Sequence, residues 1–183
     1  MGYEAAIKKA CEDVLKLNPI KHLSVKFMAD EYVVDNENRK ILSLACNVLA
    51  KDFTAILILH YLSRKLKGLP SLTGEWVSFK ELSGVEGYSL AFRKRAIEPI
   101  IRKYGSRQAD LLTVLERLPS KKVQTAEISI VIEAFTGAPV LVELWAGDDE
   151  FGPEANMLFD KSINEIFCTE DIVVLAGLVA SAL

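Results

Sequence analysis

The chain of 183 residues has little of what marks disulfide-rich, metal-binding or disordered proteins. Its three cysteines, Cys11, Cys46 and Cys168, are odd in number, far apart and without a neighbouring histidine. This pattern argues against a disulfide framework and against a zinc or iron–sulfur site. Glycine and proline together number only 16, and half of the residues are apolar. Disorder and collagen-like repeats are therefore excluded, and a globular protein with a large core is expected.

The common catalytic and nucleotide-binding motifs are also missing. The sequence contains no GxGxxG, GxxxxGK[ST], GxSxG or HExxH, and its only histidines are His22 and His60. These absences disfavour the usual nucleotide-binding folds, serine hydrolases and zinc proteases. Nothing local pairs a cysteine with His60 as a nucleophile and base. The sequence therefore assigns no catalytic residue and no cofactor.

Signals for membranes and nucleic acids are weak. The first ten residues, MGYEAAIKKA, hold no apolar export segment, and the apolar stretch 172–183 is too short to span a bilayer. The formal net charge of −3 is unsuited to binding phosphate backbones. We therefore expect a cytoplasmic protein that binds neither membrane nor nucleic acid. The oligomeric state is left open.

Acidic residues gather in the last third of the chain. Residues 123–183 contain 11 acidic side chains and a single basic one, Lys161. Such a segment attracts a cation or the basic surface of a protein partner, and it also serves as ordinary solvated surface. Both interpretations stay open.

Apolar periodicity indicates an α+β fold in a single domain, residues 1–183. Helical patterns cover residues 3–17, 52–66, 88–104 and 107–118, and a last helix follows Thr169. Strand patterns cover residues 22–28, 32–34, 41–44, 128–135, 140–145 and 157–160. Because strands and helices do not alternate, we expect an antiparallel sheet that joins N- and C-terminal strands and packs against a central group of helices.

The strongest candidate site is an acidic turn. Asp148, Asp149 and Glu150 lie between two strands, and Asp160 follows the second strand. Carboxylates suit hard cations, which makes Asp148, Glu150 and Asp160 candidate metal ligands. The same residues can instead bind turn amides or form an acidic patch for a partner. Trp145 and Phe151 flank the turn as candidate binding residues.

Three further side chains interrupt apolar segments. Glu133 and Glu143 lie within the strand patterns 128–135 and 140–145, where they either face each other or face a site. His60 lies in the apolar helix 52–66, either as a ligand or proton carrier in a pocket or as a histidine at the edge of the core.

A longer pattern resembles a known family. An apolar strand that follows a proline and ends in tryptophan precedes an acidic turn, a Leu-Phe-Asp strand and a Glu-Asp helix start. The residues are Pro139, Trp145, Gly147, Asp148, Glu150, Phe151, Pro153, Leu158, Phe159, Asp160, Glu170 and Asp171. Together with residues 58–62 and 74–82, they resemble Domain of Unknown Function family 3786 over nearly the whole chain.

The resemblance implies a metabolic context rather than a catalytic activity. Similar proteins belong to anaerobic bacteria and archaea, and some carry an N-terminal iron–sulfur module like those of corrinoid and acetyl-CoA pathway proteins. This chain lacks the cysteines of such a module. The leading hypothesis is a non-catalytic accessory or binding module in anaerobic, corrinoid-linked one-carbon metabolism. The alternative is an enzyme with a divalent-cation site at Glu143, Asp148, Glu150 and Asp160.

Overall fold

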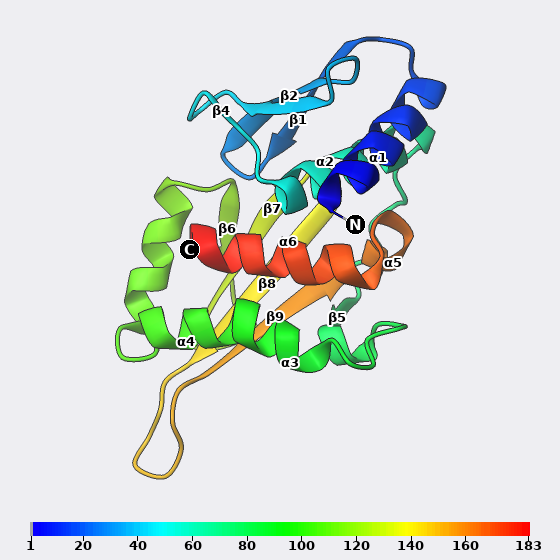
Figure 1. The fold of residues 1–183 in the computed structure, drawn as a ribbon. Coiled ribbons are helices and arrows are strands. Elements are labelled where there is room, and N and C mark those ends of the chain that lie inside the picture. Colours follow the sequence, from blue (N-terminus) through cyan, green and yellow to red (C-terminus); the bar gives the residue numbers. More distant parts are fainter. Residues whose placement is uncertain (1) are drawn as a thin grey trace. The chain divides into compact units, whose positions relative to one another are not determined.

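The computed structural model describes residues 2–183, and the chain divides into two compact units, Met1–Pro70 and Ser71–Leu183. Each unit has its own antiparallel sheet (Figure 1). The α+β class expected from the sequence is confirmed. The expected joining of N- and C-terminal strands is not found, because the strands form two separate sheets.

The first unit combines two helices with four strands. Its elements are α1 (Tyr3–Leu17), β1 (His22–Phe27), β2 (Asp30–Asp35), β3 (Lys40–Ser43), β4 (Val48–Leu49) and α2 (Asp52–Lys67), with strand order β1-β2-β3-β4. Helix α1 buries Ala10, Cys11 and Val14, the apolar stripe read from the sequence, and packs against α2. Helix α2 begins at Asp52, and Lys51 occupies the N-cap position.

The second unit is built on a five-stranded sheet. Its strands are β5 (Trp76–Ser78), β6 (Ser120–Val123), β7 (Ile128–Phe135), β8 (Ala138–Trp145) and β9 (Glu154–Asp160), in the order β5-β9-β8-β7-β6. The pairing register places Val131 opposite Leu141, Glu133 opposite Pro139 and Ser129 opposite Glu143. Side chains alternate between the two faces of each strand, so the register also assigns each residue to a face.

Helices cover one face of this sheet (Figure 1). They are α3 (Ser89–Phe92), α4 (Glu98–Tyr104) and α6 (Thr169–Ala182), with the short α5 (Ile163–Ile166) before α6. The ring of Phe92 on α3 meets Phe159 of β9 edge-on and stacks on Phe79. Phe159 therefore marks the covered face, where Val140, Val142 and Leu144 of β8 are fully buried.

Pro99 explains an irregularity in the long helical run. Residues 88–104 were expected to be helical, and Pro99 lies within this range. The run is continuous, but a π-helical segment, η2 (Arg93–Ile97), separates α3 from α4, and Pro99 lies in the first turn of α4. Proline has no N–H to donate to the carbonyl of Arg95 and its ring crowds that carbonyl, so a wider turn relieves the conflict.

The segment 107–118 is helical as expected but of the tighter 3₁₀ type, η3 (Gln108–Glu116). Its buried residues, Leu111 and Val114, are three positions apart, a spacing that a 3₁₀ helix places on one side. Among residues 2–183 no helix has the length and apolar content that crossing a membrane requires.

Candidate functional site

A groove lies on the sheet face opposite the helices of the second unit. It has a volume of about 530 Å³. Val131, Pro139 and Leu141 form part of its lining and alternate with the residues that pack under the helices, so we call this side of the sheet the groove face. Leu72 and Trp76 line the groove from the segment that leads into β5, and Lys121 lines it from β6.

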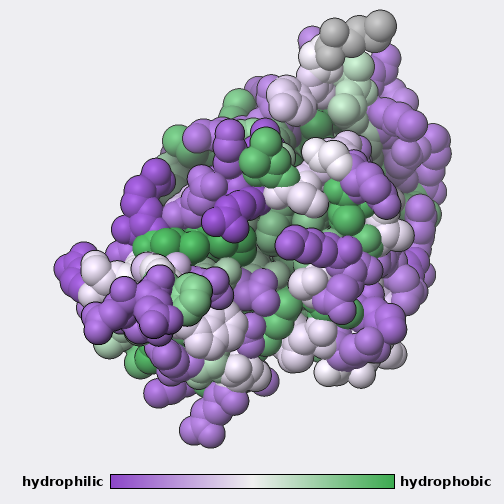
Figure 2. All heavy atoms as spheres, turned by 90° about the horizontal axis from the view of Figure 1, so that it is seen from below, coloured by the Kyte–Doolittle hydropathy of each residue, from purple (hydrophilic) through white to green (hydrophobic). Residues whose placement is uncertain are grey.

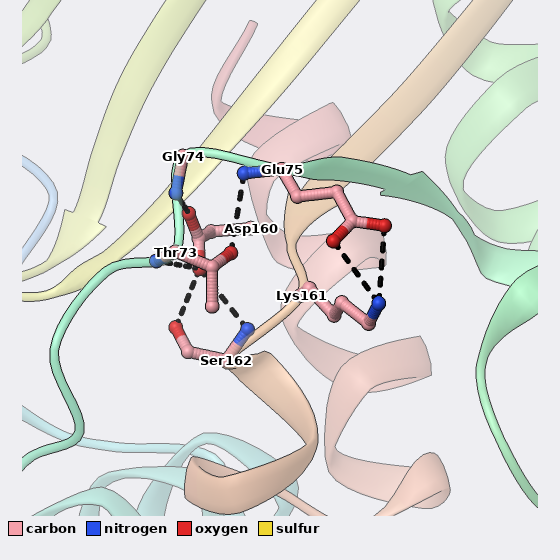
Figure 3. A network of polar contacts seen from close by, with 6 residues as sticks. All are labelled: Thr73, Gly74, Glu75, Asp160, Lys161 and Ser162. Carbon is pink, nitrogen blue, oxygen red and sulfur yellow. Dashed lines mark hydrogen bonds and ion pairs between the residues drawn. The ribbon is translucent and has the colours of Figure 1, made fainter.

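Asp160 fixes the segment 73–74 beside the groove (Figure 3). This carboxylate, at the end of β9, is 4% exposed. Its Oδ1 accepts hydrogen bonds from the backbone N and the hydroxyl of Thr73, at 3.1 and 3.0 Å, and from the backbone N and the hydroxyl of Ser162, at 3.0 and 2.7 Å. Its Oδ2 accepts one from the backbone N of Gly74 at 2.8 Å.

These donors keep Asp160 ionised. Burial alone would raise the pKa of its carboxyl, but the hydrogen bonds from Ser162, Thr73 and Gly74 outweigh burial and lower the pKa to about 2. Four of the five hydrogen bonds go to Oδ1 and one goes to Oδ2. Asp160 is thus a positioning residue that joins β9 to the wall of the groove.

An exposed ion pair lies beside this cluster. The Lys161 ammonium is 3.0 Å from Oε2 of Glu75, and the backbone N of Lys161 donates to the carbonyl of Glu75 at 2.9 Å (Figure 3). Both side chains are more than half exposed, so the ion pair adds little stability. Its effect on the site is to neutralise Lys161, the only basic residue of the last third of the chain.

Glu133 and Glu143, both on the groove face, have no hydrogen-bond or ion-pair partner in the described part of the chain. Glu133 lines the groove and is exposed. Glu143 is only 7% exposed as a residue, but its carboxylate oxygens are not fully buried, and it does not line the groove. Residues 2–183 supply no hydrogen bond or ion pair to either side chain. The sequence left open whether the two face each other. They do not, because the register places the Val131–Leu141 pair between them.

The acidic turn between β8 and β9 is held by its own backbone. Oδ1 of Asp148 accepts hydrogen bonds from the backbone N of Glu150 at 2.8 Å and of Phe151 at 2.7 Å, and these two donors lower the pKa of Asp148. A Cβ on Gly147 would lie 2.8 Å from the backbone N of Pro153. Asp148 therefore has the turn-capping role that was one of its three expected interpretations.

Phe151 is the residue of this turn that the fold does not use. It is 67% exposed, whereas Phe159 is fully buried. Asp149 and Glu150 are exposed as well, and Trp145 is half-buried on the groove face of β8. The segment 146–153 extends beyond the sheet of the second unit (Figure 1). In the view of Figure 2 the surface is mostly hydrophilic, with hydrophobic residues in small separate patches.

The expected metal ligands do not converge. Within residues 2–183 there is no group of three or more histidine, cysteine, aspartate or glutamate side chains that could hold a metal ion. Asp148 and Glu150 share the exposed turn, while Asp160 lies beside the groove. His60 belongs to α2 in the first unit, where it is half-buried.

Cys11 and Cys168 lack the lowered pKa of reactive thiols. All three cysteines of the chain are free. Burial raises the pKa of the Cys11 thiol, and burial is also the main reason that the pKa of Cys168 rises to about 11. Cys168 occupies the N-cap position of α6, and the hydroxyl of Thr169, the first residue of this helix, donates to the carbonyl of Ser83 at 3.1 Å. Both thiols are protonated at neutral pH.

The sequence missed the residues that line the groove from β5 and β6. Trp76 was not named among the candidate site residues, and Lys121 carried no signal because β6 was not expected as a strand. Of the two glutamates within apolar strands, Glu133 lines the groove and Glu143 lies on the same face outside its lining. Their position on one face of the sheet follows from the register rather than from the pattern alone.

Comparisons with known proteins give a family and no activity. No curated protein and no solved structure matches the chain. A family model described as Domain of unknown function (DUF3786) matches residues 10–182, which include parts of both units. The match agrees with the resemblance carried by the acidic turn and the start of the last helix. The chain belongs to the DUF3786 family.

Proposed function

We propose that this protein is a non-catalytic binding module whose ligand occupies the groove of the second unit. The observation that carries the proposal is the groove itself, whose volume of about 530 Å³ falls within the range of small-molecule sites. Val131, Pro139 and Leu141 supply an apolar surface, and a few charged groups stand beside it. Asp160 holds the neighbouring backbone of Thr73 and Gly74 in place before any ligand arrives, which lowers the entropic cost of binding.

We also propose that the protein has an accessory role in anaerobic, corrinoid-linked one-carbon metabolism. Its support is the family resemblance alone, since neither the groove nor the acidic turn identifies a corrinoid. A cobalamin belongs in any ligand panel for this reason. A rise in melting temperature with cobalamin would support this metabolic role. A rise only with other ligands would contradict it.

A thermal-shift panel on three proteins tests the groove. The panel contains Mg²⁺, Ca²⁺, Mn²⁺, a cobalamin, spermidine, octanoate and indole-3-acetate. The proteins are the wild type, Lys121→Trp and Lys122→Trp. Lys121 and Lys122 are adjacent exposed residues of β6, but only Lys121 lines the groove. The first variant fills the groove, and the second places the same indole on the other face.

A ligand at 100 times its dissociation constant stabilises by about 2.7 kcal/mol, or about 5–10 °C for a chain of this size. We expect an organic ligand to shift the wild type and Lys122→Trp alike and to lose its effect in Lys121→Trp. If a ligand still raises the melting temperature of Lys121→Trp, its binding site lies outside the groove. A shift with a divalent cation that disappears in Asp148→Asn would favour the cation-dependent enzyme, for which residues 2–183 provide no three-ligand group.

A second candidate function is recognition of a protein partner by the turn between β8 and β9. Its support is Phe151, which is 67% exposed on a turn that Asp148 holds in place. Phe151→Ser should abolish partner capture, and so should Asp148→Asn combined with Glu150→Gln. Leu90→Ser is the matched control, since Leu90 is 64% exposed in the same unit. Equal capture by Phe151→Ser and the wild type would reject this function.

A further inference from the structure

Helix α4 and the π-helical segment η2 before it carry an exposed basic surface. Lys94, Arg95 and Arg102 are exposed, and residues 2–183 supply no hydrogen bond or ion pair to their side chains. Because the π-helical turn adds one residue, Lys94 and Arg102, which are eight positions apart, lie about two turns apart on the same side of the run. We call Lys94, Arg95 and Arg102 the basic face.

The other basic residues of this helical run already have partners. Arg93 forms an ion pair with Glu98 at 3.6 Å, and the Lys103 ammonium donates to the carbonyl O of Leu183 at 2.5 Å. Glu98 is the only acidic residue between positions 89 and 104. The three positive charges of the basic face are therefore left without a neutralising group on their own helix.

The turn between β8 and β9 carries the opposite charge. Residues 146–154, the turn and the first residue of β9, contain four acidic side chains and no basic one. Asp148 caps the backbone of the turn, whereas Asp149, Glu150 and Glu154 are exposed and form no ion pair in the described part of the chain. Phe151 lies among them and is 67% exposed. Carboxylates around an aromatic ring suit a surface of lysine and arginine, whose cations pair with the carboxylates and lie over the ring.

The basic face and this turn adjoin in one unit without pairing. A Cβ on Gly105, the residue after α4, would lie 2.7 Å from Cγ of Pro153, so the base of the turn touches the end of the helical run. From there the turn extends beyond the sheet (Figure 1). Within residues 2–183 none of its carboxylates forms an ion pair with the basic face. Each chain therefore offers a basic surface and an acidic surface next to each other.

We propose that the basic face is the docking surface for the β8–β9 turn of a second copy of this chain. A two-fold axis beside Gly105 and Pro153 places each turn on the basic face of the other copy, so the assembly closes as a dimer. The net charge of −3 per chain is small, and salt screens it beyond about 8–10 Å, so the complementary charges at the contact decide the interaction. This inference rests on the second candidate function, recognition of a partner by the turn, and names that partner.

Charge reversal on each surface tests the docking with the intact chain. The turn variant is Asp149→Lys with Glu150→Lys, and the basic-face variant is Lys94→Glu with Arg102→Glu. Sedimentation velocity over a range of concentrations measures the mass of each protein. We expect the wild type to dimerise, each variant to weaken the dimer by about tenfold or more, and added salt to weaken the wild-type dimer.

Two controls make the test specific. Lys80→Glu with Lys122→Glu changes two exposed lysines elsewhere in the second unit, alters the net charge as the basic-face variant does, and should leave the dimer intact. An equimolar mixture of the turn variant and the basic-face variant should restore the dimer, because each reversed turn then meets a reversed face and each native turn a native face. The melting temperature of each variant shows whether it is folded, and Phe151→Ser, which changes no charge, should also weaken the dimer.

The outcomes separate the dimer from the functions proposed above. A wild type that stays monomeric up to about 1 mM, variants that dimerise as the wild type does, or a mixture that stays monomeric overturns the dimer. If Phe151→Ser then still loses a partner that Leu90→Ser captures, the turn remains a recognition site for another protein. The groove is tested separately, because Lys121→Trp changes neither the basic face nor the turn.

Discussion

Asp160 connects two segments that are far apart in sequence. It binds backbone N–H groups of Thr73 and Gly74, 87 and 86 residues earlier, and those of Ser162, two residues later. Glu143 is buried to a similar extent and has no such donors among residues 2–183. Of these two carboxylates, only Asp160 is held by the fold; the Glu143 oxygens have no protein donor in the described part of the chain and are not fully buried.

Replacing Asp160 by asparagine should destabilise the protein. The amide keeps one oxygen but turns an NH₂ group toward N–H donors, so we expect the free energy of unfolding to fall by about 2–4 kcal/mol. Urea denaturation at pH 7 measures the change. Glu75→Gln is the control and should cost well under 1 kcal/mol, because it removes only an exposed ion pair. Equal losses in the two variants would contradict the role given to Asp160.

The pH dependence of this effect has a definite sign. The pKa of Asp160 falls from 3.8 to about 2 on folding, so the stability that it contributes is fully present above pH 3.8 and is lost as the pH falls toward 2. The wild type and Asp160→Asn should therefore converge in stability over that interval. A gap that stays constant from pH 7 to pH 2 would show that ionisation of Asp160 does not matter.

At the scale of elements, two glycines lie at helix contacts. A Cβ would fit at one of them and would be too close to its neighbours at the other. A Cβ on Gly177 of α6 would lie 3.5 Å from the Cβ of Arg95, an ordinary contact. A Cβ on Gly105, after α4, would lie 2.7 Å from Cγ of Pro153, which is too close. Only the second glycine is required by packing, where the end of α4 meets the base of the β8–β9 turn.

Alanine substitutions test this difference. Gly177→Ala should raise the free energy of unfolding by about 0.5–1 kcal/mol, since alanine favours the helix and the space exists. Gly105→Ala should lower it by about 1–3 kcal/mol through crowding. Urea denaturation of the two variants and the wild type measures both changes in the free energy of unfolding, one expected to be a gain and the other a loss. A loss of stability in Gly177→Ala would mean that α6 and η2 cannot tolerate a methyl group.

Element types could be predicted from the sequence better than their pairing. The apolar stripe of α1 and the β-branched residues of β7 identified those elements with their boundaries. Strand β6 was missed because its sequence, SKKV, carries polar residues suited to a sheet edge. The division of the strands into two sheets was also missed, since periodicity gives the face of a strand and not its neighbour. For the same reason Asp160 was foreseen as a candidate but its partners Thr73 and Gly74 were not.

At the scale of the whole molecule, charge is divided unequally along the chain. The segment 71–183 holds 17 acidic and 11 basic residues, whereas 1–70 holds 8 acidic and 11 basic. The second unit therefore carries the negative charge of the chain together with the groove. A field of this sign raises the local concentration of cations and weakens as salt is added.

Hydrogen–deuterium exchange with and without a saturating ligand of the thermal-shift panel tests the central claim most directly, because it locates binding along the whole chain. The segments that border the groove are 71–76, β6, β7 and β8. We predict slower exchange at their amides, with the amides of 2–70 unchanged. Protection confined to 2–70 or to the β8–β9 turn, or no protection at concentrations that produce a thermal shift, would contradict the assignment of the groove as the binding site.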